Sequence, residues 1–476
     1  MRAQALATPR AADLKGKRIA VVGLGVSGKS AAKLALDRGA HVVGVDAKPG
    51  LPKLEDDVEL AKFGRDKTST VLGEDAFSVL EECDRMVLSP GVPSNNQHVQ
   101  RAAKNGVQVV SELGFAAECI PATTRVAAIT GTNGKSTVTT FTGQLLEHSG
   151  VSNFCGGNLG LPLSEASFVL RRNPDEYEAL VVEVSSYMME LPGRFHASVA
   201  TILNLTPDHL ERHGNMDTYG SLKCRLLTPM TEEDTVLLPH DAFLDRLAIQ
   251  AGGNAKRATI DGMPGVQINA ETKQASVCLP STSDRNMYDL EPLRAVGKHN
   301  LKNAGVALFL AEALNLGLEP SALQSAIACL EAPPHRMMVV GEHEGVIWID
   351  DSKSTNVDSS CAGISGLAQP AVVLLGGLGK GSPEGLGFAK LVPFLQQHRG
   401  VIAFGKSGAE IEQELLAAGM ACTCVGKMAD AVDLARQMAK SGDAILLSPA
   451  CASFDEFNNF IHRGKYFAEL FNKYAS

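Results

Sequence analysis

Short apolar runs, many of them β-branched, recur along the chain, and each precedes a helix-length segment of mixed apolar and polar positions. This alternation is typical of parallel βα units, whose strands are buried on both faces and read as continuous apolar runs. The strands that we expect are Arg18–Gly23, His41–Asp46, Met86–Pro90, Arg125–Ile129, Ala179–Val184, Ser198–Leu205, Val346–Ile349, Ala371–Leu375, Gly400–Phe404 and Asp443–Leu447.

Breaks in this pattern divide the expected strands into three groups. The first break is the stretch Ile120–Thr124, and the second is Ala332–Pro334, where a pair of prolines cannot continue a helix. A length of 476 residues also suggests roughly three domains. We therefore predict three α/β domains, at residues 1–120, 121–332 and 333–476.

Composition and charge narrow the class of protein. The chain is 45% hydrophobic and 20% charged, as in globular proteins, and its longest apolar runs are strand-sized, so we expect no membrane insertion. Forty-four Lys and Arg against 53 Asp and Glu give a net charge of −9, which disfavours a nucleic-acid partner. Ten cysteines without a CxxC pair, and no signal-peptide segment, indicate buried or idle thiols in a cytoplasmic protein, for which a monomer is the default.

A glycine-rich loop follows the first strand. Gly23–Gly28 fits GxGxxG between a strand and an alanine-rich helix, and Asp46 ends the next strand 18 residues beyond the last glycine. This layout is typical of a dinucleotide fold whose helix N-terminus faces a phosphate, so NAD or another nucleotide diphosphate is the expected ligand. The alternative is a tight βα turn without a ligand. The later loop Ser89–Pro93 is either a plain type II turn or a second contact to the ligand.

A second loop, Thr130–Thr137, joins a strand to a helix in the middle of the chain. The strict P-loop pattern requires glycine at the position of Ile129, so that pattern fails. Its physical core remains, because backbone amides of the loop can hold phosphate oxygens and Lys135 can neutralise them. Ser136 then places a hydroxyl where Mg²⁺ binds in such loops.

Two further strand ends carry candidate metal ligands. Glu183 ends an apolar strand, where an unpaired buried charge is costly, so a metal-binding carboxylate is the better interpretation. His209 follows the next strand and adds an imidazole, although a single histidine is more often structural. Lys223 lies in an expected helix and, from the residues alone, is an ordinary surface lysine.

These motifs and several later ones resemble those of the Mur ligase family. The resemblance is carried, in family order, by Gly131–Thr137, Gly156–Pro162, Glu183–Ser186, Thr206–His209, His299–Asn303, Pro334–Arg336, Asp351–Asn356, Gly376–Lys380 and Leu447–Ser453. The blocks Asp351–Asn356 and Leu447–Ser453 are most similar to the branch of the family that adds D-glutamate. The resemblance implies Rossmann-like N- and C-terminal domains and a central P-loop-type ATPase domain with a mostly parallel sheet.

The resemblance also implies a site for each of three substrates. The UDP end of UDP-N-acetylmuramoyl-L-alanine, in place of NAD, would contact Gly25, Val26, Ser27, Gly28, Asp46, Ser89, Pro90, Gly91 and Asn158. ATP would contact Gly131, Thr132, Asn133, Gly134, Lys135, Ser136, Thr137, Asn303, Arg336 and Asp351. D-Glutamate would contact Lys353, Thr355, Lys380, Ser453, Phe454 and Phe460.

The catalytic residues that the resemblance implies are Lys135, Glu183, His209 and Lys223. Two Mg²⁺ ions would be held by Ser136, Glu183, His209 and Lys223. In the family this last lysine is carbamylated by CO₂, which turns an ammonium into an anionic ligand. Two departures from the family's motifs, Leu378 in place of Asp and Met188 in place of Gln, affect single contacts and leave the phosphate and metal core intact.

The implied activity is ATP-dependent amide ligation, in which D-glutamate is added to UDP-N-acetylmuramoyl-L-alanine through an acyl phosphate during peptidoglycan precursor synthesis. One alternative is a folylpolyglutamate synthase, whose usual loop has glycine where Ser136 follows Lys135. Another is a nucleotide-binding regulatory module without turnover. The joint presence of Lys135, Ser136, Glu183 and His209 disfavours that module.

Overall fold

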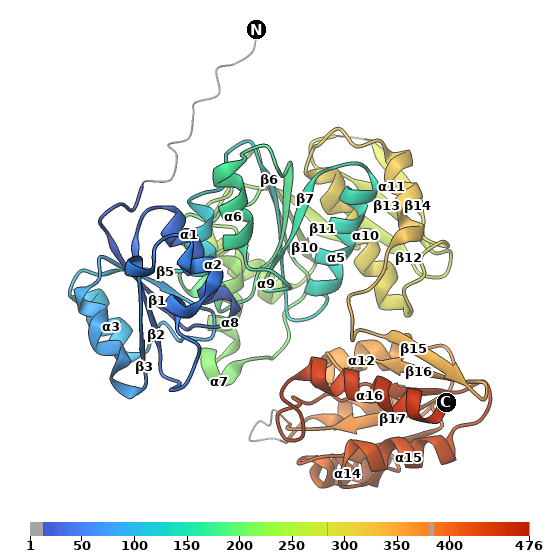
Figure 1. Ribbon diagram of the computed structural model, residues 1–476. Helices are drawn as coiled ribbons and strands as arrows, with labels where there is room; N and C mark the ends of the chain where they lie inside the picture. The colour runs from blue at the N-terminus through green and yellow to red at the C-terminus, as the bar shows by residue number, and fades with distance from the viewer. Residues whose placement is uncertain (1–12, 283, 380–384, 476) are drawn as a thin grey trace. The chain divides into compact units, whose positions relative to one another are not determined.

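The computed structural model describes residues 13–282, 284–379 and 385–475. Three β-sheets, each flanked by helices, organise these residues into three α/β domains (Figure 1). No helix in the described part of the chain is long and apolar enough to cross a membrane. The ten cysteines are free thiols, of which Cys155 and Cys329 are exposed, and none forms a disulfide.

The first sheet has the strand order β3-β2-β1-β4-β5, and all of its neighbouring strands are parallel. Its strands are β1 (Arg18–Val22), β2 (His41–Asp46), β3 (Thr68–Leu72), β4 (Arg85–Leu88) and β5 (Gln108–Ser111). Its helices are α1 (Val26–Asp37), α2 (Val58–Ala61), α3 (Gln97–Lys104) and α4 (Glu112–Ala117). The strand order reverses between β1 and β4, and ligands of open parallel sheets bind outside the carboxyl ends of strands at such a reversal.

The second sheet has the order β14-β13-β12-β11-β10-β9-β6-β8-β7. Its strands are β6 (Arg125–Thr130), β7 (Asn153–Gly157), β8 (Ala179–Glu183), β9 (Val199–Ile202), β10 (Thr235–Pro239), β11 (Lys256–Ile260), β12 (Gly265–Asn269), β13 (Gln274–Cys278) and β14 (Arg285–Asp289). Its helices are α5 (Lys135–His148), α6 (Leu163–Arg172), α7 (Leu210–His213), α8 (Met216–Cys224), α9 (Ala242–Ala251), α10 (Lys298–Ala313) and α11 (Pro320–Ala326). Because β6 lies between β8 and β9, the loops that follow these three strands share one edge of the sheet.

The third sheet has the order β15-β16-β20-β17-β18-β19, with β15 antiparallel to β16. Its strands are β15 (Met338–His343), β16 (Val346–Asp350), β17 (Ala371–Gly376), β18 (Gly400–Phe404), β19 (Thr423–Cys424) and β20 (Ala444–Leu447). Its helices are α12 (Val357–Gly366), α13 (Val392–Leu395), α14 (Gly408–Ala417), α15 (Met428–Met438) and α16 (Phe460–Ala475). Buried side chains of α12, α13 and α14 pack on one face of this sheet and those of α15 and α16 on the other.

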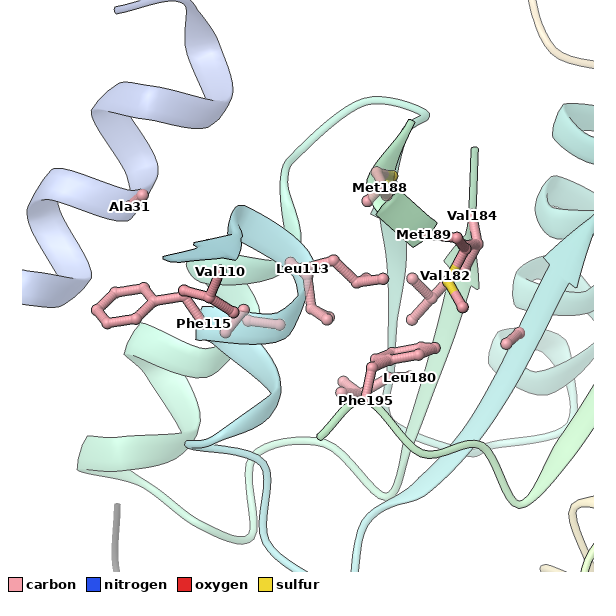
Figure 2. Packing of buried hydrophobic residues seen from close by; sticks show 14 of the residues in the cluster. Ala31, Val110, Leu113, Phe115, Leu180, Val182, Val184, Met188, Met189 and Phe195 are labelled. Carbon is pink, nitrogen blue, oxygen red and sulfur yellow. The ribbon is translucent and has the colours of Figure 1, made fainter. Parts of the chain in front are cut away.

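The first two domains share one hydrophobic core. Figure 2 shows Leu113 of α4 between Val110 and Phe115 on one side and Leu180 and Val182 of β8 on the other, and all five belong to one buried cluster. The chain accordingly divides into two compact units. The first unit is Met1–Gln267, Ala275–Tyr288 and Gly305–Ala326, and the second is Ile268–Gln274, Asp289–Ala304 and Ile327–Ser476.

A buried carboxylate also joins the first two domains. Glu112, at the start of α4, accepts a hydrogen bond of 2.7 Å from the backbone amide of Ser164 in the first turn of α6. Pro162, the residue that precedes α6, caps this helix with no side-chain hydrogen bond of its own, so Glu112 satisfies an amide that would otherwise be unpaired. The predicted domain boundaries at 120/121 and 332/333 stay predictions.

Candidate active site

A cavity of about 650 Å³ lies in the first unit, at the carboxyl ends of the strands where the first sheet reverses its order. A volume of this size suits a nucleotide or similar ligand. The cavity brings together the predicted residues Gly25, Val26, Ser27, Asp46, Ser89, Pro90, Gly91 and Asn158. Asn158 comes from the second domain, so both domains of the first unit line the cavity.

Tight backbone packing shapes the glycine loop on one wall of the cavity. Gly23 has a φ of 89°, and a Cβ on Gly28 would lie 1.9 Å from the carbonyl oxygen of Gly23. Ser89 Oγ donates to the same carbonyl oxygen across 2.7 Å. The loop therefore requires glycine at position 28 for close packing, and Gly28 itself does not line the cavity.

Asp46 holds the neighbouring backbone in place. One of its carboxylate oxygens accepts a hydrogen bond from the Leu24 amide and the other accepts one from the Lys48 amide, both at 2.9 Å. Lys48, Phe77 and Met188 are among the lining residues of the cavity that were not predicted. Lys48 was within reach of sequence reasoning because it lies two residues after Asp46, whereas the position of Phe77 had no sequence signal.

The phosphate loop connects β6 to α5. Gly131 and Gly134 have φ angles of 146° and 86°, which few other residues adopt, and α5 begins at Lys135. Nζ of Lys135 donates to the carbonyl oxygens of Gly131 at 3.0 Å and Thr132 at 2.7 Å, so the amine lies over the loop. A helix N-terminus with a lysine beside it favours a bound phosphate.

Asn204 fixes the shape of the phosphate loop and was missed by sequence reasoning. Its side-chain oxygen accepts hydrogen bonds from the amides of Thr132 (3.1 Å) and Asn133 (2.8 Å), and its side-chain nitrogen donates to the carbonyl oxygen of Asn133 (3.0 Å). The only signal in the sequence was a polar residue between Leu203 and Leu205, just after an apolar strand.

Glu183 ends β8 and is 2% exposed. Its Oε1 accepts a hydrogen bond of 2.7 Å from Asn158 Nδ2, and the Asn158 amide donates to the Glu183 carbonyl oxygen at 2.9 Å. Asn158 also lines the large cavity. One asparagine therefore contacts both the cavity for the first predicted substrate and the carboxylate predicted to bind metal.

Lys223 is 1% exposed, so its interpretation as an ordinary surface lysine is wrong. Its Nζ donates to the Gly131 carbonyl oxygen across 2.8 Å and lies 4.6 Å from the centre of the Tyr219 ring. Burial, and then the positive charge of Lys135, hold the pKa of Lys223 well below its usual value. The structure thus brings three of the predicted catalytic side chains, Lys135, Glu183 and Lys223, to the loops at one edge of the second sheet.

His209 immediately precedes α7 and has a left-handed backbone conformation, with φ 54° and ψ 28°. Its side chain is 33% exposed. Nδ1 lies 2.7 Å from the hydroxyl oxygen of Tyr187 and 3.5 Å from a Glu211 oxygen, while Nε2 lies 3.5 Å from an Asp208 oxygen. Oxygen atoms therefore flank both ring nitrogens.

The predicted metal donors are Ser136, Glu183, His209 and Lys223. The described residues contain no group of three or more His, Cys, Asp or Glu side chains placed to hold a metal ion. Mg²⁺ is usually held by one or two carboxylates together with substrate phosphates and water, so it does not require such a group. A hydroxyl in the first turn of α5 and the Glu183 carboxylate on a neighbouring strand end are the donor types that Mg²⁺ prefers in a phosphate site. The residues present fit the ion.

In the second unit, three residues predicted to contact ATP lie on separate segments. Asn303 of α10 donates from Nδ2 to Asn300 Oδ1 at 3.0 Å, and Arg336 lies half-buried before β15. Asp351 is almost fully buried, where it accepts hydrogen bonds from the hydroxyls of Ser354 (2.5 Å) and Ser448 (2.7 Å). Burial raises the pKa of Asp351 to about 6. Its carboxylate thus ties the loops after β16 and β20 together.

The residues predicted to bind D-glutamate occupy loops of the third sheet. Lys353 lies 5.5 Å above the Phe460 ring, Ser453 is buried and Phe454 is exposed, while Thr355 lies half-buried in the loop before α12. Lys380 lies outside the described residues. The flanking Leu378 pairs with Ala452 through two backbone hydrogen bonds of 2.8 and 3.0 Å.

Arg463 of α16 joins these loops and was missed by sequence reasoning. Its guanidinium, 0% exposed, donates to Ser352 Oγ (3.0 Å) and to the carbonyl oxygens of Ser352 (2.8 Å), Cys451 (2.9 Å) and Gly376 (3.3 Å). Ser352 follows β16, Cys451 follows β20, and Gly376 is the last residue of β17. An arginine inside an apolar helix pattern carried no sign of this role in the sequence.

The glycine loop, the cavity and the phosphate loop define a nucleotide-binding α/β protein of three domains. Family models match most of the chain: a Mur ligase MurD-like N-terminal domain at residues 17–111, a Mur ligase middle domain at 129–311 and a Mur ligase glutamate ligase domain at 335–451. The chain belongs to the Mur ligase family.

Individual relatives cover nearly the full length of the chain. It is 36% identical to a UDP-N-acetylmuramoylalanine--D-glutamate ligase of Anaeromyxobacter dehalogenans, with 98% of this chain and 99% of that protein covered. It is 32% identical to the ligase of the same name from Koribacter versatilis, with 97% and 99% covered. A solved structure of the UDP-N-acetylmuramate-alanine ligase of Thermotoga maritima matches with a TM-score of 0.58 at 18% identity over 96% of this chain and 100% of that chain, which shows a shared fold alone.

Proposed function

We propose that this protein is the ATP-dependent ligase that adds D-glutamate to UDP-N-acetylmuramoyl-L-alanine in peptidoglycan precursor synthesis. The observation that carries the proposal is the double contact of Asn158, which lines the large cavity and donates to Glu183 beside the phosphate loop. A UDP-sugar in that cavity would have its reacting end directed towards a phosphate site. Relatives that carry this ligase name, and that match this chain over nearly their full length, support the same assignment.

In the proposed reaction the L-alanine carboxylate attacks the γ-phosphorus of ATP, the bond to the β-phosphate oxygen breaks, and ADP leaves. The D-glutamate amine then attacks the acyl phosphate carbonyl and phosphate departs, which leaves an amide. Lys135 and the amides at the start of α5 neutralise phosphate charge, because the amine already lies over the loop at the helix N-terminus. Asn204 fixes the loop just before α5, because its side-chain oxygen accepts from the amides of Thr132 and Asn133.

Ser136, Glu183, His209 and Lys223 would hold Mg²⁺ at this site. The ion supplies charge stabilisation for the phosphoryl group when it is bound. Glu183 contributes a carboxylate already oriented by Asn158, and Ser136 contributes a hydroxyl from the first turn of α5. We propose two ions, as the family resemblance implies.

A carbamate on Lys223 is part of the proposal. A lysine amine attacks CO₂ only when it is neutral, and it forms an N–C bond and releases one proton. Burial and the nearby charge of Lys135 favour the neutral amine in Lys223. The resulting carbamate would be an anion beside Lys135 and able to ligate Mg²⁺.

The second unit carries the residues proposed to bind D-glutamate. Lys353, Ser453 and the Phe460 ring offer a cation, a hydroxyl and an apolar face to a small dicarboxylate. Asn303 and Arg336 would contact the nucleotide, and Asp351 would hold the loops around it. Because the substrates are nucleotides and a free amino acid, we place the enzyme in the cytoplasm. We take a monomer as its default state.

An ADP-coupled assay with UDP-N-acetylmuramoyl-L-alanine and a panel of amino acids tests the function. We expect ADP formation with D-glutamate and none above background with L-glutamate, L-lysine, meso-diaminopimelate or D-alanyl-D-alanine, and a product mass that corresponds to one added glutamate. Equal rates with L-glutamate would refute the assignment. A folate substrate in place of the UDP-sugar tests the folylpolyglutamate alternative, and we expect no turnover with it.

A further inference from the structure

Tyr187 lies between two parts of the site that the proposed function uses. It is half-buried, follows Ser186 after β8 and directly precedes Met188, which lines the large cavity. Its own side chain is directed to the other side, towards α7 and His209. None of the motifs discussed above assigns a role to its hydroxyl.

The Tyr187 hydroxyl forms a close polar contact with His209. Its oxygen lies 2.7 Å from His209 Nδ1, and the two rings are 5.0 Å apart. A phenol oxygen carries lone pairs that accept a hydrogen bond. A second acceptor, Glu211 Oε1, lies 3.5 Å from the same nitrogen. Two acceptors around Nδ1 favour a proton on that nitrogen.

Two neighbouring side chains hold the Tyr187 ring. The Arg212 guanidinium lies 4.3 Å from its centre and is held by an ion pair of 2.7 Å with Glu190. The ring of His213 lies 5.3 Å away, and it in turn stacks on Tyr219 at 5.5 Å with 27° between the planes. These contacts leave the phenol little freedom to rotate, so its hydroxyl is a fixed point for His209.

The backbone of His209 is unusual. It occupies a left-handed backbone conformation, which is uncommon for a residue other than glycine, at the start of the four-residue helix α7. Its side chain is one-third exposed. A histidine that binds metal through one ring nitrogen usually donates the N–H of the other to a neighbouring acceptor, which sets its tautomer and orientation.

We propose that Tyr187 is the positioning residue for His209: its hydroxyl oxygen accepts a hydrogen bond from Nδ1–H, so that the Nε2 lone pair, beside Asp208, would be available to bind Mg²⁺. The inference rests on the proposed function only in taking Mg²⁺ as the ion that His209 binds. Because Met188 forms part of the cavity wall, the same short segment carries a residue at the UDP-sugar cavity and a residue that orients the metal ligand.

Mn²⁺ binding to the full-length protein in the presence of ADP, followed by electron paramagnetic resonance, tests the inference without turnover. Tyr187→Phe removes the hydroxyl and keeps the ring. Loss of such an outer partner typically weakens metal affinity by about 10–100-fold, and we expect a loss near the lower end because other ligands remain. Tyr177→Phe is the matched control, since the ring of Tyr177 packs on the ring of Phe154, with 5.9 Å between their centres, and does not contact His209. We expect no change in Mn²⁺ affinity in this variant.

A double-mutant cycle with His209→Ala separates positioning from packing. If the hydroxyl acts through the imidazole, Tyr187→Phe adds no further loss of Mn²⁺ affinity in the His209→Ala background. An additive loss, or affinity in Tyr187→Phe within twofold of wild type, would overturn the inference. Thermal unfolding of all variants shows whether a loss of Mn²⁺ affinity comes from a loss of folding. If Tyr187→Phe is unfolded while Tyr177→Phe is folded, that result also counts against a pure positioning role. Failure of wild-type protein to form ADP with D-glutamate would refute the proposed function and leave the Mn²⁺ comparison intact.

Discussion

Nζ of Lys223 donates to the carbonyl oxygen of Gly131 across 2.8 Å, although 92 residues separate the two along the chain. Nζ of Lys135 donates to the same oxygen at 3.0 Å, so two amines share one acceptor in the phosphate loop. Two ammonium ions this close repel one another, and the buried one loses its proton more easily. Burial and this pairing therefore favour the neutral amine that the proposed carbamate on Lys223 requires.

Lys223→Ala should lose most of its ligase activity, because it removes the amine that would carry the carbamate. Added formate, acetate or propionate should restore part of the activity, since a small carboxylate can occupy the space of the missing carbamate. The measurement is D-glutamate-dependent ADP formation against carboxylate concentration. In wild-type protein, ¹³C-labelled CO₂ should give a carbamate signal in NMR that is absent from Lys223→Ala.

The control for this rescue is Lys135→Ala treated with the same carboxylates. Lys135 acts through its positive charge, so a carboxylate cannot replace it and no recovery is expected. Full activity of untreated Lys223→Ala would show that Lys223 is not a metal ligand. Equal recovery in both variants would show that the carboxylates act elsewhere.

The sequence identified Lys223 only through family resemblance, and the reason is physical. Its environment is made by the Gly131 carbonyl and Lys135, which lie far away in the chain, and by the Tyr219 ring, whose role depends on the fold. Patterns along a sequence report strands, helices and loops, because these depend on neighbours. They do not report which distant loop will bury a given amine.

Lys135→Ala should abolish ADP formation and leave binding of the UDP-sugar unchanged. The amine lies over the phosphate loop, while the large cavity is lined by other residues, so the two functions are separable. Isothermal titration with UDP-N-acetylmuramoyl-L-alanine and the coupled assay measure the two effects. Lys62→Ala, which removes an exposed lysine paired with Glu59, should change neither. ADP formation at the wild-type rate in Lys135→Ala would contradict the phosphate role.

Asp351→Asn should change how stability of the third domain depends on pH. The pKa of Asp351 is raised from 3.8 to about 6, so the folded state binds its proton more tightly than the unfolded state. The resulting stabilisation is fully present below about pH 4 and is lost as the pH rises through 6, by on the order of 3 kcal/mol. Asparagine does not titrate, and its side-chain oxygen can still accept from Ser354 and Ser448. The stability of the wild type relative to the variant should therefore fall between pH 4 and pH 7.

Trp348 makes this measurement local. It is the only tryptophan in the chain, lies buried in β16 and packs against Phe467 at 5.2 Å. Urea unfolding followed by its fluorescence reports the third domain at each pH. If the difference in free energy of unfolding between wild type and Asp351→Asn is the same at pH 4 and at pH 7, Asp351 has the same pKa in the folded and unfolded states.

The fold was predicted more fully than the site. Every strand expected from an apolar run is present within a few residues of its expected ends, because buried parallel strands need continuous apolar sequence. The described residues also contain ten strands that were not predicted: β3, β5, β7, β10, β11, β12, β13, β14, β15 and β19. Several of these, such as β12, β14 and β15, are partly exposed and so lack a continuous apolar run. At the site, glycines and strand-end carboxylates were visible, but Asn204 and Arg463 act by hydrogen bonds to distant backbone, for which no local pattern exists.

Arg463→Lys should destabilise the third domain and weaken D-glutamate binding together. The buried guanidinium donates to four acceptors on three loops, whereas an ammonium has three donors at a single point and cannot reach all of them. Burial already lowers the pKa of Arg463 to about 10, so a lysine in its place, with a lower intrinsic pKa, would be closer to losing its charge. Each buried carbonyl left without a donor costs about 1–3 kcal/mol, so we expect a loss of stability of that order or more.

Two readouts separate this effect from a general loss of folding. The unfolding transition followed by Trp348 fluorescence should shift to a lower urea concentration. At a temperature where the variant is folded, its KM for D-glutamate should rise more than its KM for the UDP-sugar, because the cavity proposed for the UDP-sugar lies in the first unit. Arg436→Lys is the matched control, because that exposed guanidinium stacks on Tyr474 at 3.7 Å and holds none of these loops. An equal rise in both KM values for Arg463→Lys would mean that the arginine supports the fold without arranging the loops predicted to bind D-glutamate.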